Sequence, residues 1–231
     1  MIPPGQRRET RKGSAVHIPD GLMDPVVWVV GFALAVPVLF IAFRRLGRET
    51  GEDRIPFMAV LAAGIFVAQM LNFPVAGGTT GHLIGAALAV VLVGPVAAMA
   101  VLTVVIVIQS LFFGDGGITA LGLNLLNMAV IAPLVSAVVY GASKRNMKAS
   151  IFAASWLSVF IAAFATAIEL SISFLISGGA YGITPLIALP AMLGYNAVIG
   201  VGEGIITVGI WAFISQVAPE ISKAGKEEVA Q

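Results

Sequence analysis

The sequence predicts an all-α membrane protein, a polytopic bundle of about seven transmembrane segments of which one is short. Of the 231 residues, 58% are hydrophobic and 11% are charged. A soluble domain, by contrast, is about 25% charged. The mean hydropathy is +0.99. The 26 glycines and 12 prolines are spread through apolar runs, where neighbouring membrane helices can satisfy the backbone groups that these residues free.

Seven apolar runs follow one another along the chain, and roughly 20 residues are needed to span the hydrocarbon of a bilayer. The runs are Val26–Phe43, Ile55–Asn72, Leu83–Val93, Val96–Phe113, Ile118–Gly141, Ser150–Ile176 and Pro185–Val217. The third run is short because Gly94-Pro95 ends it, and it covers about one half of a membrane unless it extends or protein shields it. The last run exceeds one span, and we expect an initial piece, Pro185–Leu193, that leads through Gly194 into a span from about Tyr195.

The chain predicts one membrane domain, residues 16–217, with two flanking pieces. Residues 1–15 are polar and are expected to be a disordered or non-native extension, and residues 218–231 a cytoplasmic tail. The first 16 residues lack the apolar stretch of a secretory signal. The absence of cysteine excludes disulfides and thiolate metal sites.

The distribution of Lys and Arg predicts that the N-terminus lies outside and the C-terminus inside a prokaryotic cytoplasmic membrane. With this orientation, nine of the 13 basic residues fall on the inner side, namely Arg44, Arg45, Arg48, Arg54, Lys144, Arg145, Lys148, Lys223 and Lys226. The outer loops, 73–82, 114–117 and 177–184, hold none. The other four basic residues all lie in the first 16 residues and are the one exception.

This orientation places the only two histidines, His17 and His82, on the same outer side. Each lies in a segment rich in glycine or proline, and neutral imidazole suits Zn, Cu, Fe and Ni. Either histidine alone is more simply a hydrogen-bonded loop residue, but the shared face favours a metal site. Two imidazoles do not make a tight site, so further ligands are expected.

Several segments carry a resemblance to the cobalt/nickel substrate-binding (S) components of energy-coupling-factor ABC transporters, the CbiM/NikM family. They are His17-Ile-Pro-Asp-Gly-Leu22, Asn72-Phe-Pro-Val-Ala-Gly-Gly-Thr-Thr-Gly-His82, Gly114-Asp-Gly-Gly-Ile-Thr-Ala-Leu-Gly122, Asn124 to Asn127 and Ile199-Gly-Val-Gly-Glu-Gly-Ile-Ile-Thr207. The resemblance extends over about residues 16–217.

The resemblance implies a subunit that captures Co2+ or Ni2+ for ATP-driven uptake, with no permanently bound cofactor. It also implies partners: a transmembrane coupling (T) subunit, ATPase (A) subunits and a small accessory membrane protein, within membrane lipid and without nucleic acid. The chain has no Walker A motif, so we expect a transport subunit and not an enzyme.

The resemblance further implies the ligands. Members of the family begin Met-His and hold the metal in a plane with the terminal amine, the next backbone nitrogen, the imidazole of that histidine and a second imidazole from a glycine-rich loop. The imidazoles correspond to His17 and His82. Residue 16, however, is an internal Val16 without a free amine. Because a GTG codon is read as Val internally and as Met at initiation, we hypothesise that the functional chain starts at position 16 with Met.

Other polar residues are candidates for supporting roles. Asn72, Thr79, Thr80 and Asp115 are candidates to orient the imidazoles, and Gly77, Gly78 and Gly81 to let the loop fold over the site. Glu169 and Glu203 lie within apolar helices, where acids are functional candidates. Either a role in the metal path or interhelix hydrogen bonding fits them.

Two alternative functions are compatible with this chain. One is an intramembrane metal-dependent hydrolase that uses His17, His82 and a Glu, although the chain contains no His-Glu-x-x-His and no Gly-x-Ser-x-Gly. The other is an S component for an organic micronutrient, for which three Trp and three Tyr offer little aromatic lining.

Overall fold

The structure is a computed structural model that describes residues 17–49, 51, 54–71, 73–75, 79–142 and 146–221. For residues 73–75 and 79–81 it describes the backbone alone. Several predictions lie outside the described residues: those for the extension 1–15, Val16, Asn72, Gly77, Gly78 and residues 222–231 of the tail.

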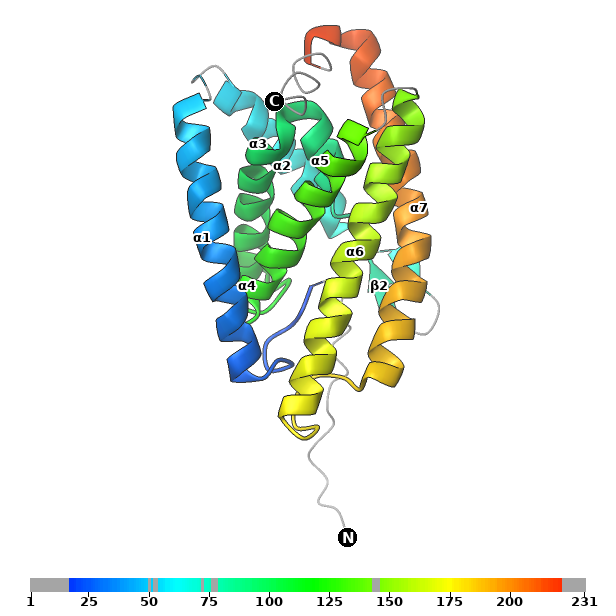
Figure 1. Ribbon diagram of the computed structural model, residues 1–231. Coiled ribbons are helices and arrows are strands. Elements are labelled where there is room, and N and C mark those ends of the chain that lie inside the picture. The colour runs from blue at the N-terminus through cyan, green and yellow to red at the C-terminus, as the bar shows by residue number, and fades with distance from the viewer. Residues whose placement is uncertain are drawn as a thin grey trace.

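The described part of the chain is a bundle of helices with one small hairpin (Figure 1). The helices are α1 (Pro25–Glu49), α2 (Ile55–Met70), α3 (Ala86–Ile108), α4 (Leu121–Asn124), α5 (Ala132–Ala142), α6 (Met147–Ile176) and α7 (Pro185–Val217). The π-helical segment η2 (Gln109–Phe113) extends α3, and η3 (Leu125–Ile131) joins α4 to α5. Five helical stretches are long and apolar enough to cross a membrane, and α2 is shorter. The predicted membrane helix bundle is thus confirmed.

The continuous helical stretch from Ala86 to Phe113 reverses its direction at Gly94-Pro95. Gly94 has φ 78° and ψ 168°, a combination that is essentially restricted to glycine. A straight helix of these 28 residues would be about 42 Å long. Yet His82 and Asp115, which flank it, both lie against His17. The kink therefore divides α3 into a short arm and a long arm, and the described helices comprise the seven segments that the sequence predicts.

The short arm of α3 lies in the centre of the bundle. Ala86, Ala89 and Val90 have no exposed surface. They pack in one core with Ala35 of α1, Ile65 of α2, Met128 of η3 and Ala162 of α6. Protein thus surrounds the segment that is too short to span a bilayer, which is one of the two arrangements that its length allows.

The outer faces of α1 and α7 are apolar and exposed. Phe40 and Ile41 of α1 and Leu186, Val198 and Phe213 of α7 are all more than half exposed. Exposed large apolar side chains along helices of this length are typical of a lipid-facing surface. The chain is therefore a multi-pass membrane protein.

Two local predictions were wrong or incomplete. First, α7 is one helix of 33 residues, and Gly194 continues it instead of dividing it. A glycine inside a helix is tolerated when packing supports the helix, and α7 packs along α6. Second, β1 (Phe73–Val75) and β2 (Thr79–Gly81) form an antiparallel hairpin with Phe73 opposite Gly81. The adjacent glycines Gly77-Gly78 between apolar and threonine-rich triplets were a readable hairpin signal.

Replacing Gly94 is expected to destabilise the bundle. Gly94→Ala puts a Cβ at a backbone conformation reserved for glycine, which costs about 1–3 kcal/mol. Thermal unfolding of the purified protein in detergent should show a lower midpoint. The control is Gly209→Ala, because an added Cβ there meets nothing within 4 Å and helical geometry favours Ala. Equal midpoints for Gly94→Ala and the unmodified chain would contradict the reversal.

Candidate metal centre

The segment before α1 enters the end of the bundle, and Asn124 holds it there. The backbone N–H of Ile18 donates to Asn124 Oδ1 at 2.9 Å, and Asn124 Nδ2 donates to the Ile18 carbonyl at 3.1 Å. The N–H of Gly117 donates to the same carbonyl at 2.8 Å. The Asn124 amide thus pairs with both the N–H and the carbonyl of Ile18, as a residue of a neighbouring strand would. It anchors the residue next to His17.

Further contacts fix the rest of residues 17–24. Asp20 Oδ1 accepts from both the N–H and the hydroxyl of Thr119, at 2.7 and 2.6 Å. The Leu22 carbonyl accepts from Gly182 N–H at 2.7 Å. The Asp24 N–H donates to Ser173 Oγ at 2.6 Å. Contacts to three separate parts of the chain hold the segment in one position.

Glycine is needed where the 114–117 turn approaches this segment. Gly116 has φ +88°, and a Cβ there would lie 3.3 Å from His17 Nδ1 and 3.0 Å from Asn124 Nδ2. A Cβ on Gly117 would lie 2.3 Å from the Asp20 nitrogen. The turn can therefore pass beside His17 only without side chains. Gly81, the one described glycine of the three that were expected to let the loop fold over the site, lies in β2 without a positive φ. Near the histidines a positive φ occurs instead at Gly21, Gly85, Gly114 and Gly116.

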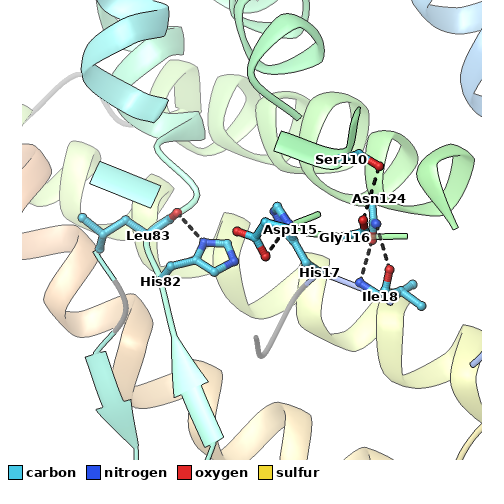
Figure 2. A network of polar contacts seen from close by, with 8 residues as sticks. All are labelled: His17, Ile18, His82, Leu83, Ser110, Asp115, Gly116 and Asn124. Atoms are coloured by element: carbon cyan, nitrogen blue, oxygen red, sulfur yellow. Dashed lines mark hydrogen bonds and ion pairs between the residues drawn. The ribbon is translucent and has the colours of Figure 1, made fainter. Parts of the chain in front are cut away.

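The two histidines meet inside the protein (Figure 2). The ring centroids of His17 and His82 are 4.7 Å apart, with an interplanar angle of 83°. The residues are 3% and 1% exposed. Asp115 Oδ1 lies 3.5 Å from His17 Nδ1. Three of the residues singled out in the sequence thus lie together at the end of the bundle where α1 begins.

The hydrogen bonding of His82 leaves one ring nitrogen available. Its Nδ1 lies 2.9 Å from the Leu83 carbonyl, which can only accept, so Nδ1 carries the hydrogen. The lone pair of the neutral ring is then on Nε2. Within the described residues, neither Nε2 of His82 nor either ring nitrogen of His17 has a hydrogen-bond partner. Three buried nitrogens without partners are unfavourable in themselves and fit a site for a bound ion.

Burial keeps His82 neutral. Desolvation, helped by the neighbouring His17, lowers the pKa of His82 from 6.5 to about 4, against smaller raising effects of the Leu83 carbonyl and Asp115. At pH 7 the imidazole is therefore unprotonated, which is the form that ligates metals.

The remaining candidate residues lie in different parts of the fold. Glu203 bonds to the backbone of Ile84 and Gly85, and Glu169 Oε2 accepts from Asn127 Nδ2 at 2.8 Å. Thr79 and Thr80 lie in β2.

Two residues that contact this region were not predicted to have a role. Gln69 Nε2 donates to the Ile84 carbonyl at 2.7 Å, and Asn124 was quoted only as part of a motif. An amide side chain within an apolar run was the signal for both.

Within the described residues, His, Asp and Glu side chains do not form a group of three that could hold a metal ion. His17 and His82 therefore need donors of another kind to bind an ion tightly. The hydrolase alternative loses support for the same reason, because neither membrane glutamate joins the histidine pair as a ligand in the described structure.

The fold and the site define a multi-pass membrane protein with a buried, nitrogen-rich site at one end. Residues 17–221 match the family described as CbiM, cobalt uptake substrate-specific transmembrane region. The chain belongs to this family, as the sequence motifs predict.

Similarity to transport proteins supports this assignment. The chain is 41% identical over 222 residues to a fused nickel transport protein, NikMN, of Rhodobacter capsulatus, with 89% of this chain and 63% of the relative covered. It is 38% identical over 210 residues to a putative metal transport protein of Haloquadratum walsbyi, covering 89% and 93%. The chain thus spans less than two thirds of the length of the fused Rhodobacter protein.

Two crystal structures share the fold. A transition metal transporter superposes with a TM-score of 0.82 at 38% identity, covering 87% of this chain and 93% of the other. A truncated transition metal transporter gives a TM-score of 0.81 at 37% identity, covering 87% and 98%.

Asn124→Ala should release the segment that carries His17. The substitution removes the partner of the Ile18 N–H, and an unpaired buried peptide group costs about 1–3 kcal/mol. Hydrogen–deuterium exchange of the metal-free protein should become faster in residues 18–22. Asn196→Ala is the control, because Asn196 donates to Met192 within its own helix. Unchanged exchange in residues 18–22 of Asn124→Ala would contradict the anchoring role.

The neutral state of His82 predicts how stability depends on pH. The unfolded chain binds a proton at the ordinary pKa of 6.5, whereas the folded pKa is about 4. The stability from this group is therefore present above pH 6.5 and is lost as pH falls towards 4, by about 1.4 kcal/mol per pH unit. Unfolding midpoints of metal-free protein should fall in this range. They should fall less for His82→Gln, and parallel pH profiles for the two proteins would contradict the shift.

Proposed function

We propose that this chain is the substrate-capture subunit of an ATP-driven uptake transporter for Co2+ or Ni2+. The observation that carries the proposal is the buried pair His17 and His82, in which both ring nitrogens of His17 and Nε2 of His82 lack hydrogen-bond partners among the described residues. Membership of a family described by cobalt uptake supports it, as does the likeness to a nickel transport protein.

The ion is held by four nitrogens, and the functional chain starts at position 16 with Met in place of Val16. The terminal amine, the His17 amide nitrogen and Nδ1 of the His17 imidazole close five- and six-membered chelate rings, and Nε2 of His82 supplies the fourth nitrogen. Four nitrogens in a plane favour Ni(II) or Cu(II) geometry. Binding releases the amide proton and is therefore pH-dependent.

Three observations support this ligand set. The described carboxylates and imidazoles do not supply a third ligand. The backbone nitrogen and the terminal amine would supply the ligands that the histidine pair lacks. The family match begins at residue 17. The four basic residues that break the charge rule all precede residue 16. Asp115 Oδ1 lies 3.5 Å from His17 Nδ1, the nitrogen that closes the six-membered ring, and its carboxylate supports the bound cation electrostatically.

The site faces the outside of the cytoplasmic membrane. The last turns of α1, which carry Arg44, Arg45 and Arg48, lie at the other end of the bundle, and basic residues mark the inner side. Transmembrane coupling (T) and ATPase (A) subunits and a small accessory membrane protein complete the transporter. The bond between Glu169 and Asn127 supports an interhelix role for Glu169 over a place in the metal path.

Removing either imidazole should abolish tight metal binding. In a chain that starts with Met at position 16, His17→Ala or His82→Ala removes a ligand. Nickel affinity measured by calorimetry should then fall by more than the roughly 10–100-fold that a supporting residue contributes. Asn196→Ala is the control. Equal metal content in His82→Ala and the parent chain would reject metal capture at this site.

The 231-residue chain should bind nickel much more weakly than the chain that starts at position 16. An internal Val16 offers a peptide nitrogen in place of the terminal amine, so the site loses one of its four nitrogen ligands and the five-membered chelate ring that this ligand closes. Calorimetry on both chains measures the difference, and mass spectrometry of the natively expressed protein identifies its first residue. Equal affinities would overturn the internal start and leave the histidine pair untouched.

A further inference from the structure

Glu203 is a buried acid that binds the start of α3. It is 1% exposed and lies on α7. Its Oε2 accepts from the Ile84 N–H at 2.7 Å and its Oε1 from the Gly85 N–H at 2.9 Å. These N–H groups precede Ala86, the first residue of α3. A helix N-terminus has unpaired N–H groups and a partial positive charge, and both favour a carboxylate.

One of these bonds leads directly to His82. The peptide group between Leu83 and Ile84 donates its N–H to Glu203, and its carbonyl accepts from His82 Nδ1 at 2.9 Å. Hydrogen bonds in series polarise one another, so a peptide that donates to a carboxylate becomes a better acceptor. Glu203, one peptide group and the imidazole of His82 therefore form a continuous chain.

A second peptide group keeps the first in place. The peptide between Ile84 and Gly85 donates its N–H to Glu203 Oε1, and its carbonyl accepts from Gln69 Nε2 of α2 at 2.7 Å. Gly85 adopts φ +78° beside Ile65. The loop after His82 is thus fixed from α7 on one side and from α2 on the other, so the Leu83 carbonyl cannot turn away from the ring.

We propose that Glu203 is a positioning residue for His82. Through the Leu83–Ile84 peptide it keeps the hydrogen of His82 on Nδ1 and leaves the Nε2 lone pair for the transported ion. Glu203 does not contact the ion. Its effect on metal affinity rests on the proposed function, whereas its effect on the imidazole is a property of the metal-free protein.

Nitrogen-15 NMR of histidine-labelled, metal-free protein in detergent at pH 7.5 tests the proposal. The chain has two histidines, and loss of signals in His82→Ala assigns the ring. In the unmodified protein, Nδ1 of His82 should give the shift of a protonated nitrogen and Nε2 that of an unprotonated one. In Glu203→Gln, both shifts should move towards the average of the two tautomers, because a side-chain amide offers one acceptor oxygen in place of two.

Thr207→Val is the matched control, since Thr207 is buried on α7 one turn after Glu203. It should leave the His82 shifts unchanged. In chains that start with Met at position 16, Glu203→Gln should weaken nickel binding by about 10–100-fold, and Thr207→Val should not.

Each result has a defined meaning. An Nε2–H tautomer of His82 in the unmodified protein would overturn the proposal even if Glu203→Gln does not fold. A folded Glu203→Gln protein with unchanged His82 shifts would also overturn it, because Glu203 would then only cap α3. If the His82 shifts move in Glu203→Gln but the parent chain that starts at position 16 binds no nickel, the positioning role is upheld and metal capture is rejected.

Discussion

The site depends on side chains that satisfy irregular backbone inside an apolar bundle. In a membrane interior an unpaired peptide group costs several kcal/mol, so segments that are not helical need partners. Asn124 supplies them to Ile18, and Glu203 supplies them to Ile84 and Gly85. Asn124 therefore binds the residue that follows His17, and Glu203 binds the second and third residues after His82. The polar groups that make the buried loops tolerable are thus the same groups that place the imidazoles.

The reversal at Gly94-Pro95 creates the second half of this arrangement. It returns the chain to the end from which it left, so that His82 before α3 and Asp115 after it face the same residue, His17. The short arm can remain in the centre because neighbouring helices cover it. A straight helix would have placed the hairpin and the 114–117 turn on opposite sides of the membrane.

The fold was largely predictable, and the positions of its polar contacts were not. Apolar runs separated by short polar or glycine-rich segments predicted the helices, and Gly94-Pro95 predicted the short segment, because length and hydropathy suffice for both. The continuity of α7 through Gly194 was not predicted, because packing along α6 outweighs a local glycine. The hairpin at Phe73–Gly81 is a local structure in a segment that was predicted only as an outer loop.

The sequence by itself determined the membrane class, the family and the two histidines, since composition and short motifs are local properties of the chain. Tertiary structure alone decided which polar residues act on those histidines. Asn124 and Ile18 are separated by 106 positions, and Glu203 and Ile84 by 119. Spacing in the sequence carries no signal over such separations. Glu203 is linked to His82 through one peptide group only because α7 packs against the start of α3. Hydrogen bonds depend on distances, and the fold alone sets those distances.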